Sequence, residues 1–504
     1  MNQYQAPGVY VEEISSITPL LATRETATPD FIGFTEKHMD GQGKDLLTTP
    51  HKIQSFDEFK SCYGTDTPQL VHIILEQRVS NSSNQVIDSS VSMKNQTLPE
   101  YLLFYSIQVY FANGGGPCYI YSVGQTPGIL DPTIFIQSLK VIETLKEATI
   151  IVFPDVCKYP LEKFGDIIDA ALFHCNTVMN RFVIIDVPGA IVGDMDTIKG
   201  INVDFRDKII ADSKSLRNGA AYYPYLETNI PYHTIDSQVT IERHIIKSVR
   251  DDGTESLEVG PYEGVQLDDD MIKVQDRTMY NLIQSVVQDQ GIVLPPSGAV
   301  AGAYVRNDVD HGVWKAPANI SLTAIKKPSV AIPDQFQESL NVDPTSGKSI
   351  NAIRHFSGKG ILIWGARTLA GNDNEWRYVP VRRFYNVVEA SVQEGTAWVV
   401  FEPNDANTWG KVKSIIENFL LDYWRKGALV GSKPEDAFFV NVGLGETMTT
   451  ADIQQGRIRI QIGLAVVRPA EFVIIRITHL LVSERLTIIQ RLFNSLKAFI
   501  GRIF

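Results

Sequence analysis

The short motifs that this 504-residue sequence lacks exclude the commonest enzyme classes first. It contains no GxxxxGK[ST], GxGxxG, HExxH or GxSxG segment, so the strongest short signatures of nucleotide-binding and hydrolytic enzymes are missing. Nine histidines form no spaced pairs, and neither His311 nor His355 has a defined acidic partner that would make it a general base. We therefore expect no catalytic residue and no cofactor.

Cysteine is also scarce, with only four residues in the chain. Cys62, Cys118, Cys157 and Cys175 are widely separated, without a CxxC pair or a Cys/His cluster at zinc-ligand spacing. We expect reduced, mostly buried thiols and no metal site.

Long apolar runs and an excess of basic residues are missing as well. No run approaches the 18 or so apolar residues of a membrane span, and the first residues lack the basic start and apolar stretch of a signal peptide. We therefore expect synthesis and folding in the bacterial cytoplasm. The net charge of −12 disfavours nonspecific binding to nucleic acid. With 44% hydrophobic residues, a chain of this length predicts two to four folded domains.

The N-terminal part predicts an extended arm followed by short strands and helices. Val9 and Val11 share one face of an extended segment, with Tyr10 and Glu12 on the other, and no partner strand follows at hairpin distance, because Ser15–Pro29 is rich in Ser, Thr and Pro. A terminal strand without a local partner must pair remotely or with another chain. The elements expected next are a strand at FIGFTE, a helix capped by Ser55, an exposed loop over 79–96, a helix ended by the Asn113–Gly116 turn, and a strand at PCYIYSVG.

The middle of the chain predicts a parallel sheet and then an acidic β region. Two continuous apolar strands, ATIIVFPD and RFVIIDVPG, flank a helical segment, which is typical of parallel strands in a covered sheet. Residues 251–270 carry eight acidic residues and no Lys or Arg. They lack the spaced ligands and central Gly of a calcium loop, so we expect a solvated outer face. Residues 326–348 are rich in Pro, Gly and Lys and predict a linker.

The C-terminal part predicts strands around one long helix. The strands are expected at GILIWGART, WRYVPVRRFYNVVEASV, AWVVFEP, FFVNVG, IRIQIGLAVV and AEFVIIRITHLLV. The helix is expected over Trp409–Lys426, because its apolar residues recur at three- and four-residue spacing and should dock it on a sheet. That stripe consists of Val412, Ile415, Ile416, Phe419, Leu420 and Tyr423. The charges left for other faces are Lys411, Lys413, Glu417, Asp422, Arg425 and Lys426.

Four segments, in this order, resemble the tail sheath family of contractile phages and the related extracellular contractile injection systems. They are APGVYVEE, FANGGGPCYIYSV, the stretch VLPPSGAVAGAYVRNDVDHGVWKAPAN, and a C-terminal block that runs from GILIWGARTLAGNDNEWRYVPVRRFYNVVEASVQEGTAWVVFEPND to RPAEFVIIRITH. The resemblance is weak over 234–290 and stops near His479. It implies a structural, self-assembling protein rather than an enzyme.

In that family, stacked six-membered rings surround an inner tube, and strands from both chain ends join a sheet in a neighbouring subunit. By resemblance, the donated strands are Val9, Tyr10, Val11, Glu12, Glu13 and Ile14 at one end, and Phe472, Val473, Ile474, Ile475, Arg476 and Ile477 at the other. Backbone hydrogen bonds would hold these strands while the linkers bend. Contraction would then be rigid-body motion hinged on Ser15–Pro29 and on the segment before Phe472.

The resemblance also implies the partners and the destination of the protein. The partners are further copies of this chain in stacked hexamers, an inner tube protein, and baseplate and cap proteins. The helix Trp409–Lys426 would face the tube, although a merely solvated face is an equal alternative for each of its charges. The finished particle would be an extracellular or membrane-anchored device, or a virion tail.

Residues 480–504 depart from the family pattern. One helical face carries Leu486, Ile489, Leu492, Phe493, Leu496, Phe499, Ile500 and Ile503. The segment has four basic residues and one acidic residue, a net charge of +3. A basic amphipathic helix can lie on a membrane or pack on a protein neighbour, and we favour the protein neighbour.

The expected fold is a multidomain mixture of α/β and α+β. An inner mixed-sheet domain is built from the C-terminal block and the N-terminal arm, and outer domains are inserted between them. The expected divisions are 1–29 (arm strand and linker), 30–125 (core or outer domain), 126–233 (α/β outer domain), 234–290 (variable β insertion), 291–348 (return segment and linker), 349–479 (C-terminal sheath domain) and 480–504 (amphipathic extension). The alternatives are a baseplate or other tail structural protein, and an α/β enzyme whose site joins residues far apart in sequence.

Overall fold

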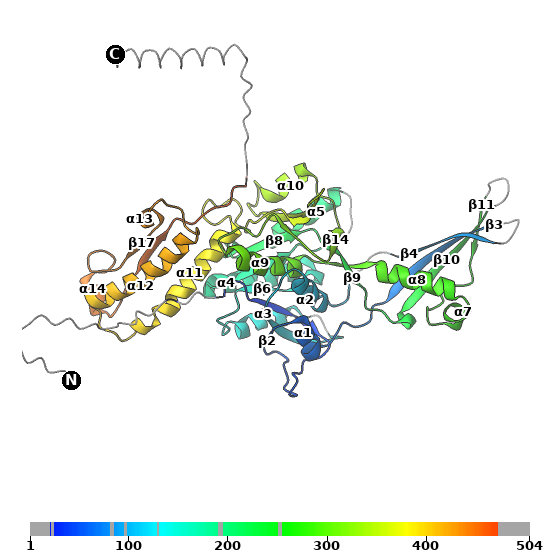
Figure 1. The fold of residues 1–504 in the computed structure, drawn as a ribbon, viewed down its shortest axis with the longest axis horizontal. Helices are drawn as coiled ribbons and strands as arrows, with labels where there is room; N and C mark the ends of the chain where they lie inside the picture. Colours follow the sequence, from blue (N-terminus) through cyan, green and yellow to red (C-terminus); the bar gives the residue numbers. More distant parts are fainter. Residues whose placement is uncertain are drawn as a thin grey trace, which may run out of the picture. The chain divides into compact units, whose positions relative to one another are not determined.

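A computed structural model describes residues 21, 25–80, 85–94, 98–128, 131–189, 195–249 and 255–471 (Figure 1). The chain divides into two units, Met1–Arg468 and Pro469–Phe504. All of the elements below belong to the first unit. The strands are β1 (Pro29–Thr35), β2 (His51–Ile53), β3 (Val71–Ser80), β4 (Val86–Met93), β5 (Cys118–Gln125), β6 (Ile150–Val152), β7 (Phe182–Asp186), β8 (Gly219–Tyr223), β9 (Leu226–Pro231), β10 (Val239–Val249), β11 (Glu255–Val259), β12 (Gly291–Leu294), β13 (Ile320–Ser321), β14 (Ile325–Pro328), β15 (Ile350–Phe356), β16 (Gly360–Ile363), β17 (Phe438–Asn441) and β18 (Gln461–Leu464). The helices are α1 (Phe56–Tyr63), α2 (Leu103–Ala112), α3 (Pro132–Ile142), α4 (Leu161–Val178), α5 (Met195–Lys208), α6 (Ser213–Leu216), α7 (Asp270–Lys273), α8 (Arg277–Asp289), α9 (Ser297–His311), α10 (Asp334–Asn341), α11 (Val379–Gly395), α12 (Ala406–Arg425), α13 (Pro434–Ala437) and α14 (Thr450–Gln454).

A nine-stranded mixed sheet forms the centre of the first unit, in the order β13-β16-β15-β8-β7-β6-β1-β5-β2. The run from β15 to β5 is parallel throughout, and antiparallel strands close both edges. Helices cover both faces: Phe31 of β1 contacts Tyr110 of α2 on one face, and Phe34 contacts Phe135 of α3 on the other. Strands buried on both sides explain why the sequence reads here as continuous apolar runs.

Buried carboxylates at the ends of the central strands fix the two helices that cover one face. Asp155 accepts hydrogen bonds from the backbone N–H groups of Phe34 (2.9 Å) and Leu102 (2.6 Å), just before α2 begins. Asp186, the last residue of β7, accepts one from Ser297 N (2.7 Å), the first residue of α9. The first N–H groups of a helix have no intrahelical partner, so a carboxylate satisfies them and also meets the positive end of the helix dipole.

A second hydrophobic core lies under a four-stranded sheet in the order β11-β10-β3-β4. The apolar face of α8 packs against this sheet through Met279, Ile283 and Val287. The acidic residues of the stretch 255–270 are exposed, and Glu255 pairs with Arg78 at 2.7 Å. The expected solvated acidic face is therefore confirmed for the described part of that stretch.

A third core belongs to a C-terminal subdomain, which we define as α11, α12, β17 and β18. The stripe expected on α12 is confirmed, because Val412, Ile415, Ile416, Phe419, Leu420 and Tyr423 are all buried. Helix α11 joins this subdomain to the central sheet: Val379 belongs to the main core, whereas Phe384, Val387 and Val388 belong to the core under α12.

The first turns of α11 are fastened to the central body by buried polar contacts. Arg383 and Asp308 of α9 form an ion pair at 2.7 Å, with side chains 3% and 2% exposed. The same guanidinium lies 4.8 Å from the ring centre of Tyr304 and donates to the carbonyl of Thr26 at 3.0 Å. One turn later, Asn386 donates to the carbonyl of Arg181. The C-terminal subdomain is thus joined to the body by a helix and not by a free linker.

Several expected elements are confirmed, and others are wrong. Ser55 caps α1, β6 and β7 pair in parallel around α4, and the Asn113–Gly116 turn links α2 to β5. The four cysteines are free and buried. The expected loop over 79–96 contains the end of β3 and all of β4, a hairpin whose exposed Ser-rich strand does not show an apolar alternation. The expected linker over 326–348 holds β14 and α10.

The third error concerns WRYVPVRRFYNVVEASV, which forms helix α11 and not a strand; AWVVFEP likewise forms a 3-10 turn (Ala397–Val399) instead of a strand. The β-branched valines favoured the strand reading. However, the buried residues Phe384, Val387, Val388 and Ser391 follow helical spacing, and Pro380 stands in the first turn, where proline is well tolerated.

The expected divisions at 125/126 and 348/349 do not separate hydrophobic cores. Strands from 30–125, 126–233 and 349–479 share the nine-stranded sheet, because parallel strands need long crossovers and therefore bring together segments far apart in sequence. The 234–290 segment does lie in a separate sheet, but together with β3 and β4 from the 30–125 segment. Among the described helices, none is both long and apolar enough to cross a bilayer.

We expect the stability of the protein to fall as the pH rises through neutrality, partly because of Asp186. Burial raises the pKa of Asp186 to about 7, from an ordinary value of 3.8. A carboxyl group whose pKa is raised on folding contributes stability that is fully present below about pH 4 and is lost as pH passes about 7. Asp186→Asn should therefore gain stability relative to the wild type between pH 5 and pH 8, as measured by urea unfolding. Asp204→Asn, at an exposed position of α5, serves as the control, and an equal shift of Asp186→Asn at both pH values would contradict the assignment.

We expect Arg383→Met to lower the free energy of unfolding by about 3–5 kcal/mol, because it leaves Asp308 buried without its counter-charge. The matched control is Lys426→Met, which removes a half-exposed pair with Asp422 and should cost at most about 1 kcal/mol. The double variant Arg383→Met/Asp308→Leu should recover most of the loss. Urea denaturation of the four proteins measures these differences; equal costs for the two single variants would contradict the role of the buried pair.

Candidate assembly site

The C-terminal subdomain ends in a sheet of only two strands. β17 and β18 are antiparallel, with Phe438 opposite Leu464 and Asn441 opposite Gln461. Helix α12 packs on β17, and Val440 and Ile462 take part in the core beneath it. Two strands alone bury little surface and are marginally stable in water. Such a sheet is suited to accept further strands.

The hydrogen-bonding direction along β18 shows which of its backbone groups are open. Ala465 N donates to Ala437 O, so residues 461, 463 and 465 direct their backbone groups toward β17. By alternation, Ile462 and Leu464 direct theirs to the opposite edge. Among the described residues, no backbone group pairs with the N–H groups of these two residues, and the carbonyl of Leu464 accepts a bond from Tyr385 Oη at 3.3 Å.

A cavity of about 860 Å³ lies beside this open edge. Its walls include apolar side chains from β18, from α11 and from the end of α4, among them Ile462, Leu464, Val388, Val392 and Met179. Apolar walls next to unpaired backbone groups suit an extended peptide: its backbone can extend the ladder while alternate side chains enter the cavity.

The outer edge of β17 is partly open in the same sense. Because Ala437 pairs toward β18, Phe438 and Val440 direct their backbone groups away from it. The N–H group of Phe438 donates to the carbonyl of Pro434, whereas no described residue pairs with the backbone groups of Val440. The side chain of Phe439 is 48% exposed on this strand. The small sheet therefore offers two edges, one on each side.

The charged residues expected on the long helix lie on its surface as predicted. Lys413 and Glu417 are 3.9 Å apart, and Lys426 and Asp422 are 2.7 Å apart, each as an i, i+4 pair and each about half exposed. Lys411 and Arg425 are exposed and have no ion-pair partner among the described residues. Exposed pairs of this kind are worth about 0–1 kcal/mol each, so a competing charged surface can replace them.

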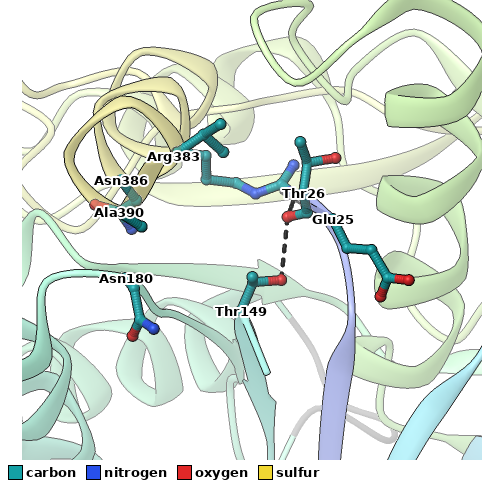
Figure 2. Close-up of a pocket in the computed structure, with 8 residues that line it drawn as sticks. Glu25, Thr26, Thr149, Asn180, Arg383, Asn386 and Ala390 are labelled. Carbon is teal, nitrogen blue, oxygen red and sulfur yellow. Dashed lines mark hydrogen bonds between the residues drawn. The ribbon is translucent and has the colours of Figure 1, made fainter. Parts of the chain in front are cut away.

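Glu25 and Thr26, a few residues before β1, lie beside the helix α11 that carries Arg383 (Figure 2). Thr26, Thr149 and Arg383 come together there: Thr149 Oγ1 donates to the carbonyl of Thr26 at 3.0 Å, and Arg383 donates to the same carbonyl at 3.0 Å. Further along the helix, Leu21 sits directly over Gly395, where a β-carbon would lie 1.5 Å from the Leu21 side chain. Leu21 also packs on the core under α12.

The structure leaves part of the expected site undescribed. The strands Val9–Ile14 and 472–477, and the extension 480–504, lie outside the described residues. The sequence did not predict three features of the site. These are the buried ion pair of Arg383 and Asp308, the close contact of Leu21 with Gly395, and the open edge of β18. Two consecutive arginines within an apolar segment were the available signal for the first of these, but the strand reading of that segment placed them on opposite faces.

The glycine turn Asn113–Gly116 and the histidines His311 and His355 form no binding or catalytic site among the described residues. The side-chain amide of Asn113 donates to the carbonyls of Val109 and Thr323 and accepts from Thr323 N, so the glycine turn holds two chain segments together. His311 and His355 are exposed. The described part of the chain contains no group of three or more His, Cys, Asp or Glu residues placed to hold a metal ion.

Comparison with known proteins finds a family match in the same part of the chain. Residues 371–479 match the family model described as the phage tail sheath C-terminal domain. Two curated tail sheath proteins are similar: that of Vibrio phage KVP40 is 25% identical over 134 residues, and that of Burkholderia phage BcepMu is 29% identical over 148 residues. These matches cover 27% and 28% of this chain but only 20% and 30% of the relatives' own length.

Solved structures are similar over nearly the whole chain, among them a contracted sheath. The sheath complex of PVC, an extracellular contractile injection system, in its contracted state is 28% identical and has a TM-score of 0.61. The match covers 95% of this chain and 98% of that one. The open-edged sheet lies within the segment that matches the phage tail sheath C-terminal domain, and over 95% of its length the chain is similar in fold to a contractile sheath protein.

Proposed function

We propose that this chain is the sheath subunit of a contractile, phage-tail-like injection system, which polymerises around an inner tube and contracts to drive the tube through a target envelope. The observation that carries the proposal is the two-stranded sheet β17–β18, with an open edge at β18, a partly open edge at β17, and a cavity of mixed polar and apolar lining beside β18. It lies inside the segment that matches the sheath C-terminal domain. A protein that acts alone has no use for such a sheet, because open edges expose unpaired backbone groups.

In this proposal, each copy donates Val9–Ile14 and the segment 472–477 to the sheets of adjacent copies in stacked six-membered rings. The buried contacts of Arg383 and Asn386 keep the C-terminal subdomain fixed to the body, so the protomer moves as one piece and the bending falls on the linkers. Lys411, Lys413, Glu417, Asp422, Arg425 and Lys426 on α12 would meet the inner tube. Their exposed pairs are weak enough to be exchanged on contraction.

The remaining partners follow from the same role. We propose contact with baseplate and cap proteins at the two ends of the cylinder, assembly in the bacterial cytoplasm, and later function in an extracellular, membrane-anchored or virion-tail particle. The extension 480–504 is proposed to contact a protein neighbour. The role needs no catalysis, no cofactor and no nucleic acid.

The first test is electron microscopy of the purified full-length protein. We expect hollow cylinders with a helical surface, because strand donation between copies makes the assembly open-ended. Small monodisperse particles under every salt and concentration condition would contradict the proposal.

The second test blocks one sheet edge without breaking the protomer. Ile462→Pro removes an N–H group that points away from β17, so the existing ladder keeps its hydrogen bonds while the open edge loses a donor. We expect a folded protomer that no longer forms cylinders. Ile462→Ala is the matched control, because it loses a similar amount of side-chain packing but keeps the N–H group. Circular dichroism and microscopy measure the two effects; normal cylinders from the proline variant would exclude this edge as an acceptor.

A further inference from the structure

Residues 25–28, directly before β1, are held by hydrogen bonds and an ion pair, whereas a hinge needs a segment free to change its backbone angles. Thr28 N donates to Thr149 Oγ1 at 2.9 Å, and Thr149 N donates to the carbonyl of Thr28 at 2.9 Å. Thr28 Oγ1 donates to Glu25 at 2.6 Å, and Glu25 lies 3.7 Å from Lys52. Together with the two bonds to the carbonyl of Thr26, these contacts hold residues 25–28 against β6 and α11 (Figure 2).

A second contact holds the N-terminal segment, between Leu21 and Gly395 at the end of α11. Any β-carbon at this position would overlap the side chain of Leu21, so only glycine leaves room for that leucine to pack there. Leu21 also contacts the core under α12. The chain is thus held at two places along one helix, beside Arg383 and beside Gly395.

We propose that Leu21 and residues 25–28 are two fixed points, together the fixed root of the N-terminal arm, and that residues 15–20 span the distance to the neighbouring copy. This inference rests on the proposed function and corrects the expectation that all of Ser15–Pro29 acts as the hinge. Arg383, Thr149 and Gly395 are then positioning residues that set where the arm leaves the protomer. Six extended residues reach about 20 Å, so the acceptor edge lies within about 20 Å of the donor's Leu21.

The C-terminal arm has a shorter span by the same reasoning. Val467 N donates to the carbonyl of Ala428, and Arg468 donates to the carbonyl of Asn374 at 3.0 Å. Only residues 469–471 separate this anchor from the expected strand that begins at Phe472, which gives a reach of about 10 Å. Leu21 contacts the last residue of α11, Gly395, whereas Arg468 contacts Asn374, which precedes the first residue of that helix; the 17 residues of α11 span about 25 Å. The C-terminal arm therefore serves a copy in direct contact, and the N-terminal arm reaches about twice as far.

Trypsin tests the fixed root without any need for assembly, because Arg24 stands in the sequence between its two fixed points, Leu21 and residues 25–28. Cleavage requires the chain around the bond to open, so we expect the Arg24–Glu25 bond of the full-length protein to be cut at least about 100-fold more slowly than in a synthetic peptide of residues 15–33. Leu21→Ser, Thr149→Val and Gly395→Val should each raise the rate about tenfold or more. Gly200→Val is the matched control, a helical glycine whose added side chain meets no atom within 4 Å. Peptide-like cutting of the wild type, or unchanged rates in the three variants, would overturn the fixed root.

A length experiment then tests its consequence for assembly. Deleting Ile17–Pro19 shortens the span by about 10 Å, and we expect this variant to form no cylinders. Adding Thr149→Val and Gly395→Val to the deletion releases the root and should restore cylinders, because the freed residues replace the missing length. Cylinders from the deletion alone, or no rescue, would overturn the proposed span. Failure of the wild type to form cylinders would instead contradict the sheath function, while the trypsin result would still decide whether the root is fixed.

Discussion

The buried ion pair between Arg383 and Asp308 is the contact on which the rest of the arrangement depends. It joins α11 to α9, and through the carbonyl of Thr26 it also holds the root of the N-terminal arm. α9 in turn is fixed to the central sheet by Asp186. A charged pair taken out of water contributes little net stability but is costly to break on one side. It therefore acts as a geometric constraint, fixing one relative position of the sheet, the C-terminal subdomain and the arm root.

Local patterns in the sequence were sufficient for elements whose burial follows a simple period. The apolar stripe of α12, the capping Ser55 of α1 and the continuous apolar strands β6 and β7 were all predictable, because each signal lies within one element. The order of strands in the central sheet was not. β1 lies between β5 and β6, and β8 pairs with β15 from more than a hundred residues away. The pattern of residues within one strand does not indicate which distant strand will pair with it.

The same contrast applies to the candidate site. The donated strands and the charges of α12 came from the sequence and from the family resemblance. The anchors came only from the structure, because Arg383 and Asp308, or Leu21 and Gly395, meet across large sequence separations. The valines of α11 misled the reading of that segment, since β-branched residues favour strands, whereas here a helix is imposed by burial of one face on two different cores.

Magnitudes explain why a sheath subunit would combine open strand edges with weak surface charges. A six-residue strand that joins an edge makes about six backbone hydrogen bonds, each worth about 1 kcal/mol net, and further apolar burial in the cavity beside β18 adds to this. An exposed ion pair on α12 contributes about 0–1 kcal/mol. In the proposed assembly, the contacts that would yield when the lattice changes shape are therefore those on α12, and donated strands would stay paired. If the arm roots are fixed as proposed, the short spans outside them would determine how far neighbouring copies can separate before a strand is pulled from its sheet.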